Sequence, residues 1–235
     1  MTNDAPFHVG LTPELVVDTA LELTEHSHLL GWSIRDLARR LDVTASVIYH
    51  HVGGKDLIAR RVVERVLDGL GAPSADLPWD EYFRNLLFAA YPIVAAHPGV
   101  AKWLLMHGPT FPAALPILDR GIAALLRAGF GDQAGLAYAT LLNTALLTIT
   151  IGDDRLLHEE DGPRDHASMM AEFRDASEGS PGLQLLTRTL IDPFLRGGDA
   201  AVTQREAYYR FVVDTTITGL AAQLTGSGLQ GEDRG

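Results

Sequence analysis

The apolar positions of this chain recur at intervals of three and four residues along most of its length. This spacing places them on one face of an α-helix, whereas a half-buried strand alternates every second residue. We find no alternating stretch and no internal repeat, so the pattern predicts an all-α fold. The expected helices span residues 12–26, 33–41, 44–51, 55–70, 79–96, 98–107, 112–128, 132–157, 166–176, 181–196 and 199–224.

Capping residues mark the ends of the first helices. Thr12 is a favourable N-cap and Pro13 suits the first helical position, because proline lacks the N–H that is unsatisfied there anyway. Ser33 is placed to cap the second helix. Gly53 and Gly54 end the third, since glycine adopts positive φ at little cost.

Small and turn-forming residues divide the chain into two parts. GAPSADLP, residues 71–78, predicts a boundary between an N-terminal module of residues 1–70 and a helical body of residues 71–225. The polar, acidic stretch 158–170 predicts a mobile loop or a short, poorly anchored helix. The glycine-rich residues 226–235 predict a flexible tail.

The second and third helices are joined only by Asp42 and Val43. Two short helices linked by so tight a turn define the helix-turn-helix, whose second helix enters the DNA major groove. The turn needs a residue with positive φ, and Asp42 tolerates that geometry better than most non-glycine residues. The spacing therefore predicts a helix-turn-helix within the N-terminal module.

The composition and the apolar segments indicate where in the cell the protein is expected. The absence of cysteine excludes disulfides, thiolate metal sites and a cysteine nucleophile, and it fits the reducing cytoplasm. Residues 1–10 lack the pattern of a signal peptide. The apolar run 135–152 is marginally long enough to span a bilayer, but Asn143 and four threonines within it favour a buried helix. We therefore expect a cytoplasmic protein without a membrane partner.

The formal net charge of −11 by itself argues against nucleic acid, because phosphate binding depends on Lys and Arg. The charge is unevenly distributed, however. Residues 31–66 hold seven basic and four acidic side chains, whereas residues 72–235 hold 12 and 20. A locally basic module on an acidic body is weak evidence for nucleic-acid contact by the module.

The run SIRDLARRLDVTASVIYHHVGGKDLI, residues 33–58, resembles the DNA-binding domain of TetR family transcriptional regulators, and ALEL at 20–23 matches too. The wording IYHHV leans toward the tetracycline-repressor-like branch. The chain departs from the family at Asp42 and at the small Ala45 and Ser46. The resemblance implies a three-helix helix-turn-helix domain, then a helical ligand-binding and dimerisation domain. It also implies a homodimer on a palindromic double-stranded DNA operator, released by a small-molecule effector.

Helical geometry assigns sides to the third helix. Ile48 and Val52 point inward, whereas Ser46, Tyr49 and His50 share an outward face. Arg39 and Arg40 either contribute to the DNA-binding surface or are solubilising surface charges. Basic residues of the fourth helix are expected on its outer face, with intrahelical partners such as Asp56 and Glu64. They are Arg60, Arg61 and Arg65. The predicted DNA-binding residues are Ser33, Arg35, Thr44, Ala45, Ser46, Val47, Tyr49, His50, His51 and Lys55.

No catalytic residue, metal or cofactor is predicted. His50 and His51 are neighbours that diverge by about 100° around a helix, so they chelate one ion poorly. No nucleophile elbow, Walker loop or dinucleotide fingerprint is present. A cation site in the polar stretch is a weaker alternative to plain surface charge; it would use His158, Glu159, Glu160, Asp161 and Asp165.

Two groups of residues in the body are candidates for binding. Large side chains around a Gly-Pro break and polar residues in an oily helix predict an effector pocket, with an ordinary core or packing against a twin helix as alternatives. Its residues are Trp103, Met106, His107, Phe111, Asn143, Thr144 and Thr148. One side of the last helix, which carries mostly small residues that allow close approach, predicts a two-fold interface together with the apolar helix 132–152. The residues on this side are Phe211, Thr215, Thr218, Gly219 and Ala222.

The sequence thus predicts a non-enzymatic, ligand-responsive regulator, a repressor that binds DNA as a homodimer. The alternative is an all-helical small-molecule-binding protein or enzyme whose helix-turn-helix no longer binds DNA.

Overall fold

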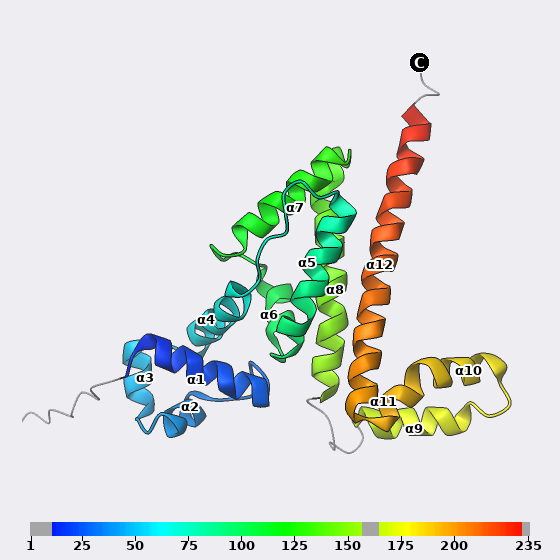
Figure 1. The fold of residues 1–235 in the computed structure, drawn as a ribbon. Helices are drawn as coiled ribbons and strands as arrows, with labels where there is room; N and C mark the ends of the chain where they lie inside the picture. Colours follow the sequence, from blue (N-terminus) through cyan, green and yellow to red (C-terminus); the bar gives the residue numbers. More distant parts are fainter. Residues whose placement is uncertain (1–10, 157–164, 232–235) are drawn as a thin grey trace, which may run out of the picture.

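A computed structural model describes residues 11–156 and 165–231 of the chain, and these residues form helices and no strand. Four helices make up the N-terminal module (Figure 1). Their bounds confirm the predicted pattern to within two residues: α1 Pro13–His26, α2 Ile34–Arg40, α3 Ala45–His51 and α4 Lys55–Asp68.

The module folds around the apolar stripes of its helices. Val16, Leu37, Ile48 and Ile58, one from each helix, are fully buried. Each such burial stabilises the fold by roughly 1.5–3 kcal/mol. The polar atom of the buried Trp32 is satisfied, because its indole N–H donates to the Thr24 hydroxyl over 3.0 Å.

Among the described residues, eight further α-helices form the body, together with a 3-10 turn, Gly131–Gln133, and a π-helical turn, Thr187–Ile191. Residues 69–78 contain no helix and lead from α4 into α5. In Figure 1, α5 to α8 stand together, α12 runs along α8, and α9 to α11 gather at the lower end of α12. The bounds are α5 Trp79–Ala95, α6 Val100–His107, α7 Leu115–Arg127, α8 Ala134–Leu156, α9 His166–Ala176, α10 Pro181–Leu186, α11 Asp192–Arg196 and α12 Gly198–Gly231.

Helix α8 is the centre of the body. It packs against α5, α6, α7 and α12 through a stripe of Ala137, Leu141, Ala145 and Ile149, all buried. Among the described residues only the stretch Gly131–Arg155 is long and apolar enough to cross a membrane. Core helices pass the same test, so this is weak evidence for a span.

Two predictions differ from the structure at the C-terminal side. The helix expected at 181–196 is interrupted by a π-helical turn, Thr187–Ile191, which turns the buried Thr187 and Ile191 inward. Helix α12 continues to Gly231, where a tail from residue 226 was predicted. Each added residue gains one backbone hydrogen bond, so an established helix extends through poor helix formers.

Residues 157–164 and 232–235 lie outside the described residues. The first of these segments contains most of the candidate cation site.

Candidate functional site

The turn between α2 and α3 has the geometry that the sequence predicted. Asp42 has φ of 53° and is the one non-glycine residue with positive φ in the described parts of the chain. The Val43 N–H donates to the Ala38 carbonyl over 3.0 Å, which ties the turn back to α2. Gly53, with φ of 105°, ends α3 in the same way that glycine commonly ends helices.

Helix α3 presents its predicted outer face to solvent. Ile48 is fully buried and Val52 nearly so, which fixes the helix on the module. On the opposite side Ser46, Tyr49 and His50 are exposed, and 56% of the Tyr49 surface is accessible. The helix therefore offers a polar and aromatic edge of the size that a major groove admits.

The N-cap residues of α2 and α3 differ in their hydrogen bonds. Ser33 forms a capping box: its hydroxyl accepts from the Asp36 N–H over 3.2 Å, and the Asp36 carboxylate accepts from the Ser33 N–H over 2.9 Å. The Ser33 hydroxyl also donates to the Asp36 carboxylate over 2.6 Å, and this bond, together with that from the Ser33 N–H, holds the pKa of Asp36 below its usual value. Thr44 occupies the N-cap position of α3, but its side chain makes no capping hydrogen bond.

Lys55 is placed differently from the expected phosphate contact. Its ammonium donates to the Leu30 carbonyl over 2.7 Å and to the Trp32 carbonyl, and it lies 5.0 Å from the centre of the Trp32 ring. Burial lowers its pKa. Two of its three donors thus tie α4 to the loop before α2, and at most one remains for DNA.

The remaining predicted DNA-binding residues lie along the same edge. Arg35 is exposed and makes no ion pair with a described residue. Ala45, Val47 and His51 are half-buried. The His51 ring meets that of His50 edge-on at 5.7 Å, the geometry of a packed pair. No cluster of three potential metal ligands occurs in the described residues.

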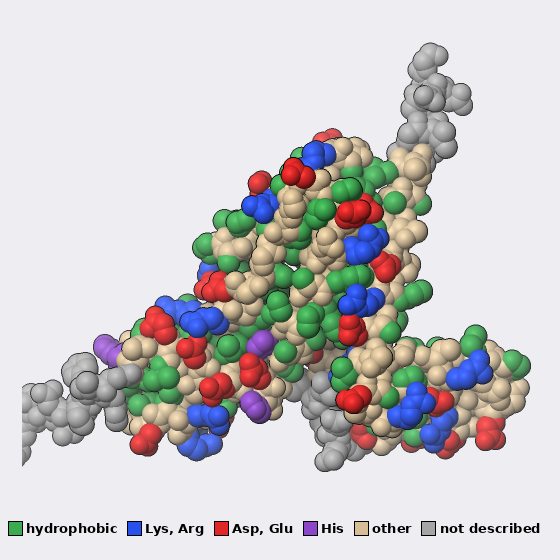
Figure 2. All heavy atoms as spheres, viewed as in Figure 1, with side chains coloured by type: hydrophobic (Ala, Val, Ile, Leu, Met, Phe, Trp, Pro, Cys, Tyr) green, Lys and Arg blue, Asp and Glu red, His purple; other side chains and the backbone are tan. Residues whose placement is uncertain are grey.

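Many cations of the module are neutralised within it. Arg39 pairs with Asp36, Arg60 with Glu64 and Arg65 with Asp18, at 2.7–3.1 Å. Arg40 reaches Glu22 on α1. On the face shown in Figure 2, acidic and basic side chains are accordingly intermixed over this domain. Arg35 is thus the arginine most available to a partner at α2.

The predicted effector-pocket residues do not surround one cavity. Trp103 stacks on His107 at 4.3 Å and on Phe111 at 5.5 Å, and the Arg60 guanidinium lies over Phe111 at 5.9 Å. This cluster joins α4 to the α6–α7 connection. Met106 is 75% exposed, and Asn143 and Thr144 lie on α8 away from the cavity described next. Of the predicted pocket residues only Thr148 lines that cavity. The position of a residue around its own helix does not show which neighbouring helix its side chain meets, so the sequence could not predict this.

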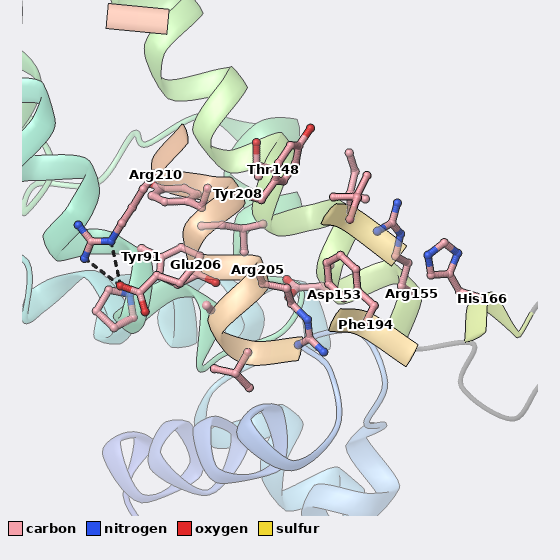
Figure 3. Close-up of a pocket in the computed structure, with 18 of the residues that line it drawn as sticks. Tyr91, Thr148, Asp153, Arg155, His166, Phe194, Arg205, Glu206, Tyr208 and Arg210 are labelled. Carbon is pink, nitrogen blue, oxygen red and sulfur yellow. Dashed lines mark hydrogen bonds and ion pairs between the residues drawn. The ribbon is translucent and has the colours of Figure 1, made fainter. Parts of the chain in front are cut away.

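A cavity of about 550 Å³ lies between α5, the end of α8, α9, α11 and the start of α12 (Figure 3). Tyr91, Phe194 and Tyr208 are aromatic side chains of its wall. Asp153, Arg155, Asp165, Arg205, Glu206 and Arg210 bring charge to it. Its size is within the range of small-molecule sites, and apolar walls with a few polar groups are typical of them. Apart from Thr148, no residue of this wall was predicted from the sequence as an effector-pocket residue; the run REAYYR, residues 205–210, is the signal that could have indicated it.

Asp153 connects the cavity to the N-terminal module. Its carboxylate accepts from the Gly99 N–H over 3.0 Å, and burial raises its pKa to about 6. Gly99, with φ of 91°, leaves no room for a side chain, since a Cβ there would lie 2.4 Å from Cε1 of His28. The neighbouring Pro98 carbonyl accepts from the Leu29 N–H over 2.8 Å. Asp153 thus contacts Gly99, and Gly99 with its neighbour Pro98 contacts the α1–α2 loop. These two steps link the wall of the cavity to the N-terminal module.

Helices α8 and α12 share an outer surface, the α8–α12 face, that no described element covers. On α8 it carries Leu136 and Leu147, which are 71% and 52% exposed. On α12 the five residues predicted for a dimer interface are all exposed. They are Phe211, Thr215, Thr218, Gly219 and Ala222. Two long helices with apolar and small outer residues thus stand side by side (Figure 1).

Comparisons with known proteins agree with this geometry. A family model described as a helix-turn-helix domain matches residues 20–79, which include α2, α3 and α4. An HTH-type transcriptional regulator of Saccharopolyspora erythraea is 26% identical over 170 residues, 72% of this chain and 71% of its own length. An uncharacterized HTH-type transcriptional regulator of Bacillus subtilis, YobS, is 24% identical over 163 residues, 65% of this chain and 85% of its own.

The likeness extends over the whole fold. A possible TetR family transcriptional regulator of Streptomyces coelicolor A3(2) superposes with a TM-score of 0.69 and 26% identity, covering 89% of this chain and 98% of that one. The chain is a TetR-like, DNA-binding transcriptional regulator. A second TetR family protein of Streptomyces coelicolor, ActR in complex with actinorhodin, has a TM-score of 0.62 at 22% identity, covering 89% and 97%. The two relatives compared by sequence are regulators, not enzymes.

Proposed function

We propose that this TetR-like protein is a homodimeric repressor that binds a palindromic operator and is released by a small-molecule effector. The observation that carries the proposal is the exposed outer face of α3, held by the buried Ile48 behind a turn with Asp42 in left-handed geometry. That arrangement is the one in which a recognition helix enters the major groove. Such a protein acts where the DNA is, in the cytoplasm of a bacterium, without a membrane partner.

The proposed DNA contacts divide by chemistry. Tyr49 and His50 are exposed on α3 and can reach sugar, phosphate and base edges, and the guanidinium of Arg35 can bind guanine through two hydrogen bonds. Ser46 supplies a hydroxyl, and Ala45 and Val47 offer methyl groups to thymine. The phosphate backbone is contacted, in the proposed complex, by groups at the margin of this surface. These are Ser33, Thr44, His51 and the one N–H of Lys55 that is not bonded to a carbonyl.

Dimerisation is proposed through the α8–α12 face. A palindrome requires two modules about 34–36 Å apart, and a two-fold axis supplies them. Two α8 and two α12 helices would form a four-helix packing, in which Phe211 of one copy meets small residues of the other. Asn143 and Thr140, exposed on the same side of α8, would then find partners on the twin helix.

The effector is proposed to occupy the cavity and to favour the arrangement that does not bind DNA. An effector with a differential affinity of about 2–3 kcal/mol would change operator affinity by roughly 30- to 150-fold. ActR of Streptomyces coelicolor has been solved with actinorhodin and with (S)-DNPA, so a similar fold holds small molecules. The route from the cavity to the module runs through Asp153, Gly99 and His28.

The test is binding to DNA from upstream of the protein's own gene, measured by fluorescence anisotropy at 0.15 M salt, about physiological ionic strength. We expect one fragment to bind at least about 10³-fold more tightly than random DNA of equal length. If no fragment exceeds random DNA, the proposal fails.

Variants locate the surface. Tyr49→Ala and Arg35→Ala are each expected to weaken operator binding by about 10-fold or more, because each loses contacts worth about 1–3 kcal/mol. Lys55→Ala is a poor test, since it also removes two hydrogen bonds that hold the module together. Arg188→Ala, an exposed arginine in the body, is the matched control and should leave binding unchanged. Equal affinity for Tyr49→Ala, Arg35→Ala and the control would contradict the assignment of α3.

A further inference from the structure

The charged side chains around the cavity are not equally engaged. Glu206 accepts from the Arg210 guanidinium at 2.8–2.9 Å, and Arg210 in turn covers the Phe88 ring. Asp165 accepts from the Ala167 N–H and caps α9. These three charged groups are therefore occupied by contacts within the protein.

Asp153 is also compensated. Its carboxylate bonds the Gly99 N–H, and Gly99 is the N-cap of α6, so the positive end of that helix faces the carboxylate. Among the described residues Arg205 has no comparable partner. It lies half-buried on the first turns of α12 and makes no ion pair or side-chain hydrogen bond with any described residue. Arg155 on α8 likewise has no ion pair with a described residue.

Of the described charged groups of this wall, the guanidiniums of Arg205 and Arg155 therefore remain without an ion pair to another described residue. Burial raises the pKa of Tyr91 on α5 and of Asp153 on α8, and the positive charge of Arg205 lowers both pKa values by a smaller amount. The charge of Arg205 therefore acts on both side chains. Arg155 lies close enough that the two guanidiniums disfavour each other. A half-buried guanidinium with five donors and no acceptor is costly to leave unpaired.

The walls select shape as well as charge. Tyr91, Phe194 and Tyr208 enter from α5, α11 and α12, and Figure 3 shows them with Arg205 around the same space. Flat rings pack on such side chains in stacked or edge-on geometry, each pair adding to the burial itself. A volume of about 550 Å³ leaves room for a ligand of two or three fused rings.

We propose that the effector cavity takes a planar aromatic anion, with its carboxylate or equivalent acid group on Arg205 and its rings between Tyr91, Phe194 and Tyr208. Only the regulatory role of this ligand rests on the proposed function, because the ligand can bind to the cavity without DNA. Arg205 determines specificity, because a carboxylate accepts two parallel N–H bonds from one guanidinium whereas an amide does not. Arg155 adds attraction from the α8 side.

The test uses three probes with the same ring system: 2-naphthoate, 2-naphthamide and 2-(aminomethyl)naphthalene. Binding to the full chain is measured by isothermal titration calorimetry at pH 7.5. We expect 2-naphthoate to bind at least about 10-fold more tightly than the neutral amide, since a hydrogen bond to a charged group is worth more than a neutral one. The cationic probe should bind most weakly.

Substitutions separate charge from shape. Arg205→Gln should weaken 2-naphthoate by about 10- to 100-fold and leave 2-naphthamide within about twofold. Arg205→Lys should recover part of the loss, because it restores the charge without the fork. Arg188→Gln, outside the cavity, is the matched control. Thermal unfolding of each variant verifies that it is folded.

Several outcomes would overturn the proposal. They are amide or amine binding as tight as that of the naphthoate, an Arg205→Gln variant that keeps its naphthoate affinity, and failure of all three probes to bind at millimolar concentration. The function is judged separately. If 2-naphthoate binds but leaves operator affinity unchanged, the ligand class stands and its role as effector fails. If the operator is bound but no naphthoate is, the ligand class fails and DNA binding stands.

Discussion

At the residue scale, Asp153 is the carboxyl group whose surroundings most change its chemistry. Burial raises its pKa from the ordinary 3.8 to about 6, against the opposing effects of the Gly99 N–H and Arg205. The native state therefore holds this proton more tightly than the unfolded state does. The sign follows from linkage: the free energy of unfolding falls as pH rises from about 4 to 6, and the cost is fully present above pH 6.

Asp153→Asn should remove this pH dependence. The amide oxygen still accepts from the Gly99 N–H but carries no charge. The stability of the variant relative to the unaltered chain should therefore increase by about 2–3 kcal/mol between pH 4 and pH 7. Urea unfolding across this range measures the difference, with the exposed Asp132→Asn as control. A difference that is constant with pH would show that Asp153 is not titrating as its burial implies.

Gly99 lies where the body closely approaches His28 of the N-terminal module. Gly99→Ala should cost about 2–4 kcal/mol, because it forces a side chain into positive φ and against the His28 ring. Gly129→Ala is a matched control: its φ is 95°, but nothing lies within 4 Å of the added Cβ. It should lose only the backbone part, about 1–2 kcal/mol. Equal losses in urea unfolding would mean that His28 yields without cost.

At the scale of elements, the helix-turn-helix depends on one backbone conformation. Asp42→Gly should keep the stability within about 1 kcal/mol, since glycine adopts a φ of 53° freely. Asp42→Val should lose about 1–2 kcal/mol and weaken operator binding, because a β-branched residue resists left-handed geometry and α3 shifts. Circular-dichroism melts and anisotropy titrations measure the two effects. Asp68→Val, on the helical end of α4, is the control and should melt like the unaltered chain.

Helix α12 shows how one element serves two surfaces. Its buried stripe of Tyr209, Val213 and Ile217 packs on the body, and the Tyr209 hydroxyl donates to the Leu87 carbonyl over 3.0 Å. An ion pair of Asp214 with Arg84 fixes the register against α5. The first turns of the same helix supply Arg205 to the cavity. The later turns carry the exposed residues of the α8–α12 face.

At the scale of the whole molecule, the proposed dimer can be broken from its centre. Phe211→Glu and Leu147→Glu should each convert dimers to monomers at micromolar concentration. Every substitution acts twice in a two-fold interface, so the loss of about 1.5–3 kcal/mol per side chain doubles and dissociation rises about 10²- to 10⁴-fold. Sedimentation velocity measures the mass.

Operator binding should fall with the dimer in these two variants, since each half-site alone binds weakly. Met106→Glu is the control: it places a charge on a side chain that is 75% exposed on α6, away from the α8–α12 face. Dimers that persist in both Phe211→Glu and Leu147→Glu would place the interface elsewhere.

The sequence by itself determined the helices of the N-terminal module and the helix-turn-helix within it. Both follow from local physics: apolar spacing, capping by Ser33, and the positive φ that Asp42 tolerates and Gly53 favours are properties of neighbouring residues. It also determined which side of α3 and of α12 faces outward, because a helix fixes the angle between its side chains. These predictions needed no knowledge of how distant segments pack.

Only the tertiary structure decided the cavity and the role of Lys55. Tyr91, Asp153, Phe194 and Arg205 come from four helices spread over more than a hundred residues, and no periodicity relates one helix to another. Lys55 is basic and follows α3, but whether its ammonium meets a phosphate or a carbonyl depends on a loop about 25 residues earlier in the chain. Side chains meet across the fold according to how helices cross, and the sequence specifies that only through the packing of the whole core.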